Sequence, residues 1–564
     1  MEEPMSEDTK ETVVEEVAVT EQPTEAADTA EQPVTAEQPV TAETEAKAEE
    51  NTVEDVDPFA AAKEGMKKGA DAIRKGAGTA TEQVKKLPKK VLYGILGAAA
   101  LLVLIVLIAS CAGGGNPNQT ADYGKNYFYQ LDNYTLVNLN GDQVETDERI
   151  RTVENSADAS ATVYLDSDDT LYLVTAKGEK KIADDVDSFV VSMYGDTVAY
   201  VTEAEDSIGE LYLYRVSKGK ATKVDKDVYT KNIVLSPDGG SIAYIGGCEA
   251  SDSWFGTPSG DLYVSKKGKS GEKQASDAVP CAITKNAKQV YYIKDSKLYM
   301  NDEKIASDLS SYSTLAFNQD NTELLYLKDG NTYYYTLKAG EPVRLKTEAF
   351  RDLLLPENTV SSVESRGNME ICTYGIKSFN KQLMNLDGSI YYVTDKGETV
   401  EKIHSGVRGY QVSEDGKSLL YVDYSGTLHY VKNVHKSTED EKIGADLDVD
   451  MFYASKDLDT IYYVSGDELY YLKKDKGVRI TDEVDDVVYS DKFGVVFYVC
   501  DGELYFAKKT SKSKEKLIGE KVMSFGMIGD AVVFIYDKDD EGEKYILYKM
   551  TGKDKMKELA TVER

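Results

Sequence analysis

The chain has 564 residues, with 99 Asp and Glu against 66 Lys and Arg, which gives a formal net charge of −33. This acid excess argues against a nucleic-acid-binding protein, which needs a basic face to displace counterions from phosphates. Five Cys are too few for a disulfide scaffold. The 40 Tyr and 43 Gly beside only 12 Pro favour many short strands over helices.

Residues 1–57 form the first segment and carry 19 acidic side chains against two basic ones. The hexapeptide EQPVTA occurs at 31–36 and again at 37–42, and the segment has no Phe, Tyr, Trp, Leu or Ile. Such a segment buries too little apolar surface to offset the entropy of ordering. We therefore predict a disordered acidic tail that acts as a solvated spacer, with a docking or signalling tail as the alternative.

Residues 58–90 are basic instead, with nine Lys and Arg against three acidic residues. Phe59, Met66, Ala70 and Ile73 can share one face of a helix, although four glycines weaken it. The segment is predicted to be a basic juxtamembrane element. It is either an amphipathic helix on anionic lipid or a flexible basic linker.

Residues 91–110 read VLYGILGAAALLVLIVLIAS and contain no charge. Twenty helical residues span about 30 Å, the hydrocarbon thickness of a bilayer. Four lysines precede this run, whereas glycines follow it. The positive-inside rule then predicts a single-pass membrane protein with a cytoplasmic N-terminus and an extracellular C-terminal region.

Cys111 closes the sequence Ile108-Ala109-Ser110-Cys111, which resembles a lipobox, the signal at which bacterial lipoproteins are cleaved and acylated. About 90 residues precede the apolar run, which departs from the pattern of that family. We therefore expect an uncleaved anchor. The alternative is a surface lipoprotein that carries lipid on Cys111.

After a Gly-rich linker at 111–121, residues 122–564 are periodic. Tyr-rich runs such as Leu469-Tyr470-Tyr471-Leu472 start at intervals of mostly 34 to 42 residues, with longer intervals at 211–262 and 332–390. Each unit reads as four short strands separated by Lys, Asp and Gly turns, as in 469–499. Four-stranded units of about 40 residues predict an all-β fold, an extracellular β-propeller region.

The number of blades stays open at this point. About ten four-stranded units can be distinguished, more than the four to eight of a typical ring. The region is either one large ring or two rings, with a possible internal boundary within 340–388. The last unit is short of strands, and residues 126–129 are a candidate strand to complete it and close the ring.

The segments Ser236-Pro237-Asp238-Gly239 and Ser413-Glu414-Asp415-Gly416 lie between apolar stretches, and 316–326 is a degenerate third copy. They resemble the repeat of TolB-like, WD40-like propellers, and we expect their Asp-Gly turn between the third and fourth strands of a unit. The whole arrangement resembles uncharacterised membrane-anchored propeller proteins of Gram-positive bacteria. This resemblance implies a fold and leaves the function open.

No catalytic, cofactor-binding or metal-binding residue is predicted. His404, His429 and His435 are the only histidines, and their spacing matches no metal motif. His429 replaces a Tyr of the repeat and is expected to stand in for an aromatic ring on a strand. Cys248 and Cys281 lie in neighbouring units and could pair, although buried thiols are equally compatible with the sequence.

The long interval at 246–261 contains the only Trp, and Trp254 and Phe255 form a candidate partner-binding loop. The leading functional hypothesis is a non-catalytic binding or sensing module for an envelope protein, a peptide or a glycan. The alternative is a propeller enzyme that acts on carbohydrate or peptide with paired carboxylates of raised pKa.

Overall fold

The computed structural model describes residues 121–563, except 125, 176–177, 250–258, 310–313, 347, 367–368, 445–446, 513–516, 518–520 and 538–543. In this part of the chain the secondary structure is β throughout, apart from two single-turn 3₁₀ helices at Lys285–Ala287 and Asp395–Gly397. The strands form eleven sheets, which we number 1 to 11 in chain order.

Nine sheets have four strands in simple up-and-down order, whereas sheet 1 has three and sheet 6 has six. Sheets 1 to 3 contain β1 (Phe128–Gln130), β2 (Thr135–Asn138), β3 (Gln143–Glu145); β4 (Ile150–Asn155), β5 (Thr162–Asp166), β6 (Leu171–Thr175), β7 (Gly178–Ala183); and β8 (Val186–Val191), β9 (Thr197–Glu205), β10 (Ile208–Arg215), β11 (Lys220–Tyr229). Sheets 4 and 5 contain β12 (Val234–Leu235), β13 (Ser241–Glu249), β14 (Ser259–Lys266), β15 (Glu272–Ser276); and β16 (Val279–Ile283), β17 (Val290–Lys294), β18 (Lys297–Met300), β19 (Glu303–Ala306).

The second half of the chain continues the pattern with one interruption. Sheets 6 and 7 contain β20 (Thr314–Asn318), β21 (Glu323–Lys328), β22 (Asn331–Thr336), β23 (Val343–Lys346), β25 (Ser361–Arg366), β26 (Met369–Tyr374); and β24 (Phe350–Leu354), β27 (Gln382–Leu386), β28 (Ser389–Thr394), β29 (Thr399–Ser405). Sheets 8 and 9 contain β30 (Val407–Val412), β31 (Leu419–Asp423), β32 (Leu428–Val431), β33 (Glu441–Ile443); and β34 (Met451–Ala454), β35 (Ile461–Ser465), β36 (Glu468–Lys473), β37 (Lys476–Thr481). Sheets 10 and 11 contain β38 (Asp486–Ser490), β39 (Val495–Cys500), β40 (Glu503–Lys508), β41 (Ser511–Lys512); and β42 (Val522–Ile528), β43 (Ala531–Asp537), β44 (Lys544–Gly552), β45 (Lys555–Glu563).

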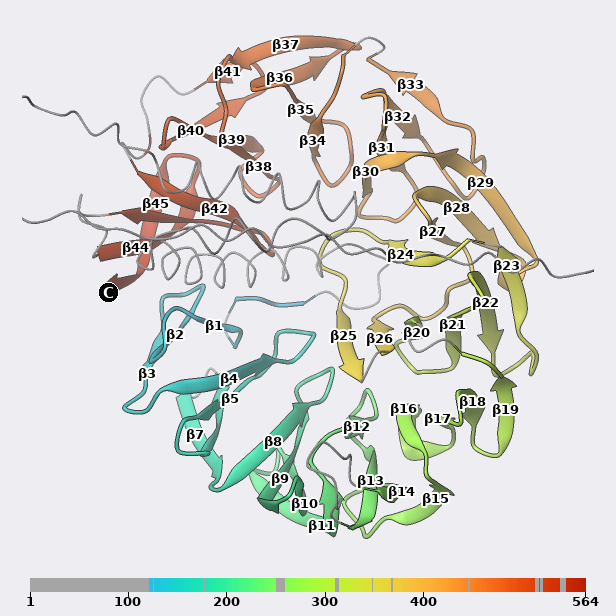
Figure 1. The fold of residues 1–564 in the computed structure, drawn as a ribbon. Helices are drawn as coiled ribbons and strands as arrows, with labels where there is room; N and C mark the ends of the chain where they lie inside the picture. Colours follow the sequence, from blue (N-terminus) through green and yellow to red (C-terminus); the bar gives the residue numbers. More distant parts are fainter. Residues whose placement is uncertain are drawn as a thin grey trace, which may run out of the picture. The chain divides into compact units, whose positions relative to one another are not determined.

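The sheets follow one another around a ring in chain order (Figure 1). The buried apolar residues fall into eleven clusters, and each cluster joins one sheet to the next. One cluster contains Leu325 of sheet 6 and Met384 of sheet 7, so the core continues across the irregular stretch at 340–388. The described residues therefore form a single β-propeller of eleven blades, one large ring instead of two.

The ring closes where sheet 11 packs on sheet 1. Val137 and Leu559 share one core cluster, Gln143 Nε2 donates to the Leu559 carbonyl at 3.0 Å, and Lys549 Nζ donates to the Leu139 carbonyl at 2.8 Å. The prediction that residues 126–129 complete the last unit was wrong, because β1 pairs with β2 and sheet 11 supplies all four of its own strands. The ring is therefore closed by the packing of sheet 11 against sheet 1, without a shared strand among the described residues.

Stacked aromatic pairs explain the Tyr-rich repeats. In nine sheets a ring on the second strand of the sheet's up-and-down order lies directly opposite a ring on the third, with interplanar angles of 3° to 17°. Tyr463 and Tyr470, for example, are register partners with ring centroids 5.1 Å apart. Cross-strand aromatic pairs of this kind stabilise a sheet beyond the area that they bury.

The Ser-x-Asp-Gly segments lie at a different turn from the one expected. Ser236–Gly239 joins β12 to β13 and Ser413–Gly416 joins β30 to β31, so each lies between the first and second strands of its sheet. Ser236 Oγ donates to Asp238 Oδ1 at 2.8 Å, which fixes the turn. The predicted period agrees with the sheets, but the predicted unit at 469–499 begins at the third strand of a sheet. It therefore contains two strands of sheet 9 and two strands of sheet 10.

Sheet 6 carries an inserted hairpin. The chain leaves sheet 7 after β24, forms β25 and β26, and returns to sheet 7 at β27. Strand β26 pairs in parallel with β20, the first strand of sheet 6. Because first strands of successive sheets contact one another, the hairpin extends sheet 6 toward the axis of the ring, as β25 does in Figure 1.

Antiparallel order gives the ring two distinct faces. The turns between first and second strands lie on one face, here the proximal face, and the turns between second and third strands lie on the other, the distal face. The described chain enters at the proximal face, where Asp122 N donates to the carbonyl of Asp158 in the β4–β5 turn and Ala121 N donates to the carbonyl of Asn358 after β24. The distal turns are tied to the next sheet by bonds such as Val449 N to the Gly426 carbonyl.

The acidic tail, the basic segment, the predicted membrane helix at 91–110, Cys111, Trp254 and Phe255 lie outside the described residues. Within the described residues, no helix has the length and apolar character that a membrane crossing requires.

Candidate functional site

Exposed apolar side chains collect on the distal face. Four large hydrophobic residues are strongly exposed among the described residues, and three of them lie at this face. Tyr424 (64% exposed) occupies the turn between the second and third strands of sheet 8, and Met451 (56%) starts β34 there. Tyr134 (49%) lies in the β1–β2 turn of three-stranded sheet 1, which is also distal, because the Asn133 carbonyl accepts a bond from the N–H of Ile150 at the start of β4. Trp254 and Phe255 of the candidate loop lie outside the described residues.

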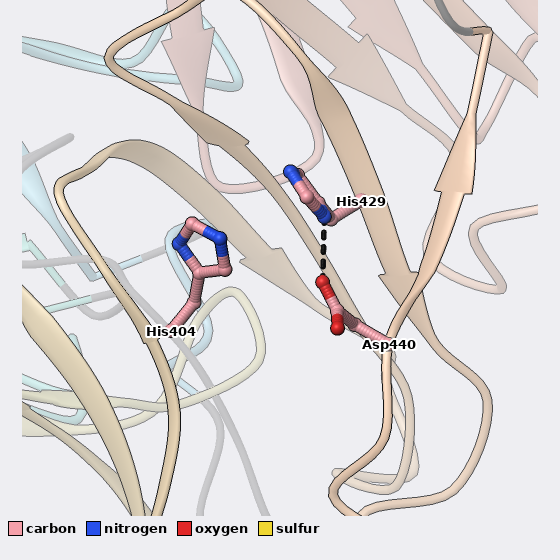
Figure 2. Close-up of side chains that lie close together, drawn as sticks. All are labelled: His404, His429 and Asp440. Carbon is pink, nitrogen blue, oxygen red and sulfur yellow. Dashed lines mark hydrogen bonds and ion pairs between the residues drawn. The ribbon is translucent and has the colours of Figure 1, made fainter.

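Two of the three histidines lie close together near the turn that contains Tyr424. His404 lies near the end of β29 in sheet 7, His429 lies on β32 of sheet 8, and Asp440 precedes β33 (Figure 2). One potential ligand atom from each side chain lies within 4.8 Å of the other two. The two imidazole centroids are 4.7 Å apart.

Sheet 8 fixes the orientation of His429. The imidazole stacks on Tyr421 with centroids 4.8 Å apart and an interplanar angle of 3°, in the third-strand place that a Tyr takes in the other stacked pairs. The expectation that His429 stands in for an aromatic ring is therefore confirmed. Unlike a phenol, its ring has two nitrogens, and both face carboxylates: Nδ1 lies 2.5 Å from Asp440 Oδ2 and Nε2 lies 3.2 Å from Asp423 Oδ2.

Asp423 is held by the turn that it starts. Its Oδ1 accepts hydrogen bonds from Ser425 Oγ at 2.6 Å and from Thr427 N at 3.0 Å, so Oδ2 remains for His429. Burial alone would raise the pKa of Asp423, but the bonds from Ser425, Thr427 and His429 outweigh it and lower the pKa to about 2. For the Asp440 carboxyl, burial is likewise outweighed by bonds from Tyr421 and His429, which lower its pKa. Both carboxylates are thus ionised at neutral pH.

The third histidine does not join this cluster. His435 is exposed, and its Nδ1 lies 2.6 Å from the Tyr392 hydroxyl. The cluster could not be predicted from the sequence, because His404 and His429 lie on two different sheets and no spacing along the chain reveals their contact. Asp423 carried a weak signal, since Asp-x-Ser-x-Thr is a turn pattern in which the carboxylate accepts backbone N–H bonds.

Paired carboxylates occur near the inserted hairpin. Asp352 on β24 accepts hydrogen bonds from the hydroxyls of Tyr410 at 3.1 Å and Tyr374 at 3.2 Å. Burial and the nearby Glu370 raise its pKa nevertheless. On β4, burial and the charge of Glu364 raise the pKa of Glu154 to about 7.

The four cysteines among the described residues form no comparable site. Cys248 Sγ donates to the Ile245 carbonyl at 3.6 Å and Cys281 Sγ donates to the Val279 carbonyl at 3.8 Å, so the structure does not pair the two. Glu483, Cys500 and Asp501 also lie within ligand distance of one another. Burial and the acidic neighbours raise the pKa of the Cys500 thiol, however, which disfavours the thiolate that a metal would bind.

Comparison with known proteins adds two distant structural likenesses. The crystal structure of the tricorn protease aligns with 72% of this chain and 49% of its own, at 12% identity and a TM-score of 0.25. That of the eukaryotic initiation factor aligns with 78% of this chain and 96% of its own, at 11% identity and a TM-score of 0.39. The chain spans about half the length of the tricorn protease. No family model and no curated protein matches the sequence.

Proposed function

We propose that the chain is a TolB-like β-propeller anchored in a cell membrane by residues 91–110, with the ring outside the cell. It binds an envelope protein, a peptide or a glycan without catalysing a reaction. The apolar run and the lysines before it support the anchor and its orientation. The Ser-x-Asp-Gly turns support the relationship to TolB-like propellers.

The single observation that carries the binding role is the position of the exposed apolar residues relative to the chain's entry. Residue 121 joins the ring at the proximal face, and the ten residues 111–120 reach at most about 35 Å. The proximal face is therefore directed toward the membrane in this proposal. The distal face, with Tyr134, Tyr424 and Met451, is directed away from it.

Aromatic side chains on such a face suit a partner-binding role. Exposed Tyr and Trp supply large, rigid contact areas and dominate the energy of many interfaces. Tyr424 is positioned firmly for this, because its N–H donates to the Gly406 carbonyl at 2.8 Å and its ring lies over Gly406. A Cβ at position 406 would come within 3.0 Å of that ring.

The test is cross-linking in intact cells, followed by capture of the full-length protein and of two variants. Trp254→Ala with Phe255→Ala removes the candidate loop anchors, and Tyr424→Ala removes the exposed ring. We expect at least one of these variants to lose tenfold or more of the captured partner. Val363→Thr, an exposed apolar site on the inserted hairpin, is the matched control and should capture normally. Equal capture by all of them would contradict the binding role.

A second candidate function is supported by Glu154. A carboxyl with a pKa of about 7 beside a second carboxylate suits general acid–base chemistry at neutral pH. Turnover of a glycan or peptide panel by the wild-type chain, with loss in Glu154→Gln, would favour the enzyme. Absence of turnover together with a captured partner would favour the binding module.

A further inference from the structure

The cluster of His404, His429 and Asp440 has the composition of a metal site. It offers two imidazole nitrogens and one carboxylate oxygen, all within 4.8 Å of one another. Imidazole with carboxylate is a ligand set that Zn²⁺ and related divalent ions prefer, and three protein ligands leave one coordination position open. The stacked pairs of the other sheets contain only Tyr and Phe, so among the described residues only the pair of sheet 8 contains an imidazole.

The two ring nitrogens of His404 have different surroundings. The Nδ1 atom of His404 is buried and has no hydrogen-bond partner among the described residues. A buried polar atom without a partner costs about 1–3 kcal/mol of free energy, and most such atoms in folded proteins are satisfied. The other ring nitrogen, Nε2, lies on the side of His429 and Asp440 (Figure 2), so Nε2 is the atom whose lone pair a neutral His404 offers to a cation there.

Asp423 contacts the His429 nitrogen that faces away from Asp440. Histidines that bind a metal through one nitrogen usually donate the other N–H to a carboxylate, which fixes the ring and the tautomer. His429 has that geometry, with Nε2 3.2 Å from Asp423 Oδ2 and Nδ1 directed at Asp440. The turn at Ser425 and Thr427 holds Asp423 in place.

We propose that His404, His429 and Asp440 bind a divalent transition-metal ion of the zinc type, with Asp423 orienting His429 and a fourth position open. Because the ligands come from the last strand of sheet 7 and from sheet 8, the ion links two neighbouring blades. It does so next to Tyr424 on the distal face. This inference is independent of whether the ring binds a partner.

The test uses the full-length protein in detergent, first stripped with a chelator and then titrated with ZnCl₂ by calorimetry. Co²⁺, followed by visible absorption, reports the nitrogen and oxygen ligands directly. We expect one saturable equivalent. His404→Gln and Asp440→Asn should weaken binding by about 100-fold, and Asp423→Asn, which acts through His429, by about 10–100-fold at unchanged stoichiometry.

Two matched substitutions control for loss of imidazole and of charge. His435→Gln removes the histidine outside the cluster, and Glu439→Gln removes an exposed carboxylate next to Asp440. Both should bind zinc like the wild type. Thermal unfolding in chelator checks that each variant folds, and His404→Gln should match the wild type there, because its Nδ1 makes no bond. No saturable binding, or equal binding in folded His404→Gln and Asp440→Asn, would overturn the proposal.

Discussion

Glycine 477 illustrates how single residues make room for the stacked tyrosines. It lies on β37 beside Tyr463, and a Cβ at this position would overlap the Tyr463 hydroxyl oxygen. Gly271 stands in the same relation to Tyr244 in sheet 4. The phenol of the second strand thus extends over the fourth strand, and only a residue without a side chain leaves it space.

Gly477→Ala should therefore destabilise the ring by about 1–3 kcal/mol, because an added methyl group overpacks a buried site. Tyr463→Phe removes the atom that clashes, so the double variant should recover part of the loss. Urea denaturation of the two single variants and the double variant measures the coupling between the positions, which we expect to be about 0.5–3 kcal/mol. Additive losses would show that the two positions do not meet.

Glu154 gives the ring a defined pH dependence. The pKa of its carboxyl is about 7 in the folded state, against 4.5 for an unperturbed glutamate. Because the folded-state pKa is raised, its contribution to stability is fully present below about pH 4.5 and is lost as the pH rises through about 7. The backbone N–H of Val191 favours the charged form and offsets only part of the burial and of the repulsion from Glu364.

Glu154→Gln keeps the shape and removes the charge. The variant should match the wild type at pH 4 and exceed its free energy of unfolding by about 1–3 kcal/mol at pH 8. Denaturant unfolding at the two pH values measures this difference. Glu145→Gln, an exposed position on β3, should change neither value, and a similar gain there would contradict the assignment.

At the scale of strands and sheets, the sequence predicted the repeat and missed its phase. Runs such as Leu469–Leu472 recur mostly 34 to 42 residues apart, so the approximate period and the four-strand content of a blade could be derived from the pattern alone. A periodic pattern has no marked beginning, however, and the run at 469 is β36, the third strand of sheet 9. Only the pairing of strands identifies the first one.

The inserted hairpin was beyond prediction for a related reason. The sequence indicates an insertion at 332–390, but β26 pairs in parallel with a strand more than 50 residues earlier, and local patterns carry no information on such a partner. The histidine cluster has the same origin, because His404 and Asp440 come from different sheets. The single aromatic replacement at His429 could be predicted, since it follows the repeat.

The hairpin should also be an integral part of the core. Ile371 on β26 is buried in the cluster that joins sheets 5 and 6, whereas Val363 on β25 is 50% exposed. Ile371→Ala should cost about 2–4 kcal/mol of stability, and Val363→Ala should stay within about 0.5 kcal/mol. Thermal or urea unfolding distinguishes the two. Equal losses would mean that both strands of the hairpin are buried.

In the whole molecule, the closure of the ring and the proposed membrane anchor depend on different parts of the chain. The ring is closed by the packing of sheet 11 on sheet 1, and no strand is exchanged between them. The proposed anchor lies before residue 121 and makes no use of that interface. Removing the anchor should therefore leave the ring folded.

Replacement of 91–110 by a polar linker should move the protein from the membrane fraction to the soluble fraction with an unchanged unfolding midpoint. Cys111→Ser should have no effect on the membrane-bound fraction, because an uncleaved helix needs no lipid. Fractionation, with intact mass of the mature chain, measures both. A mature chain that begins at an acylated Cys111 would replace the helical anchor with the lipoprotein alternative.

The most direct test of the binding account is site-specific photo-cross-linking in intact cells, with the cross-linking residue placed either at Tyr424 on the distal face or at Asp530 in the β42–β43 turn on the proximal face. The account predicts a discrete covalent adduct of constant mass from position 424 and none from position 530. Adducts from 530 alone, or equal labelling at both positions, would contradict the claim that this propeller binds its partner through the face directed away from the membrane.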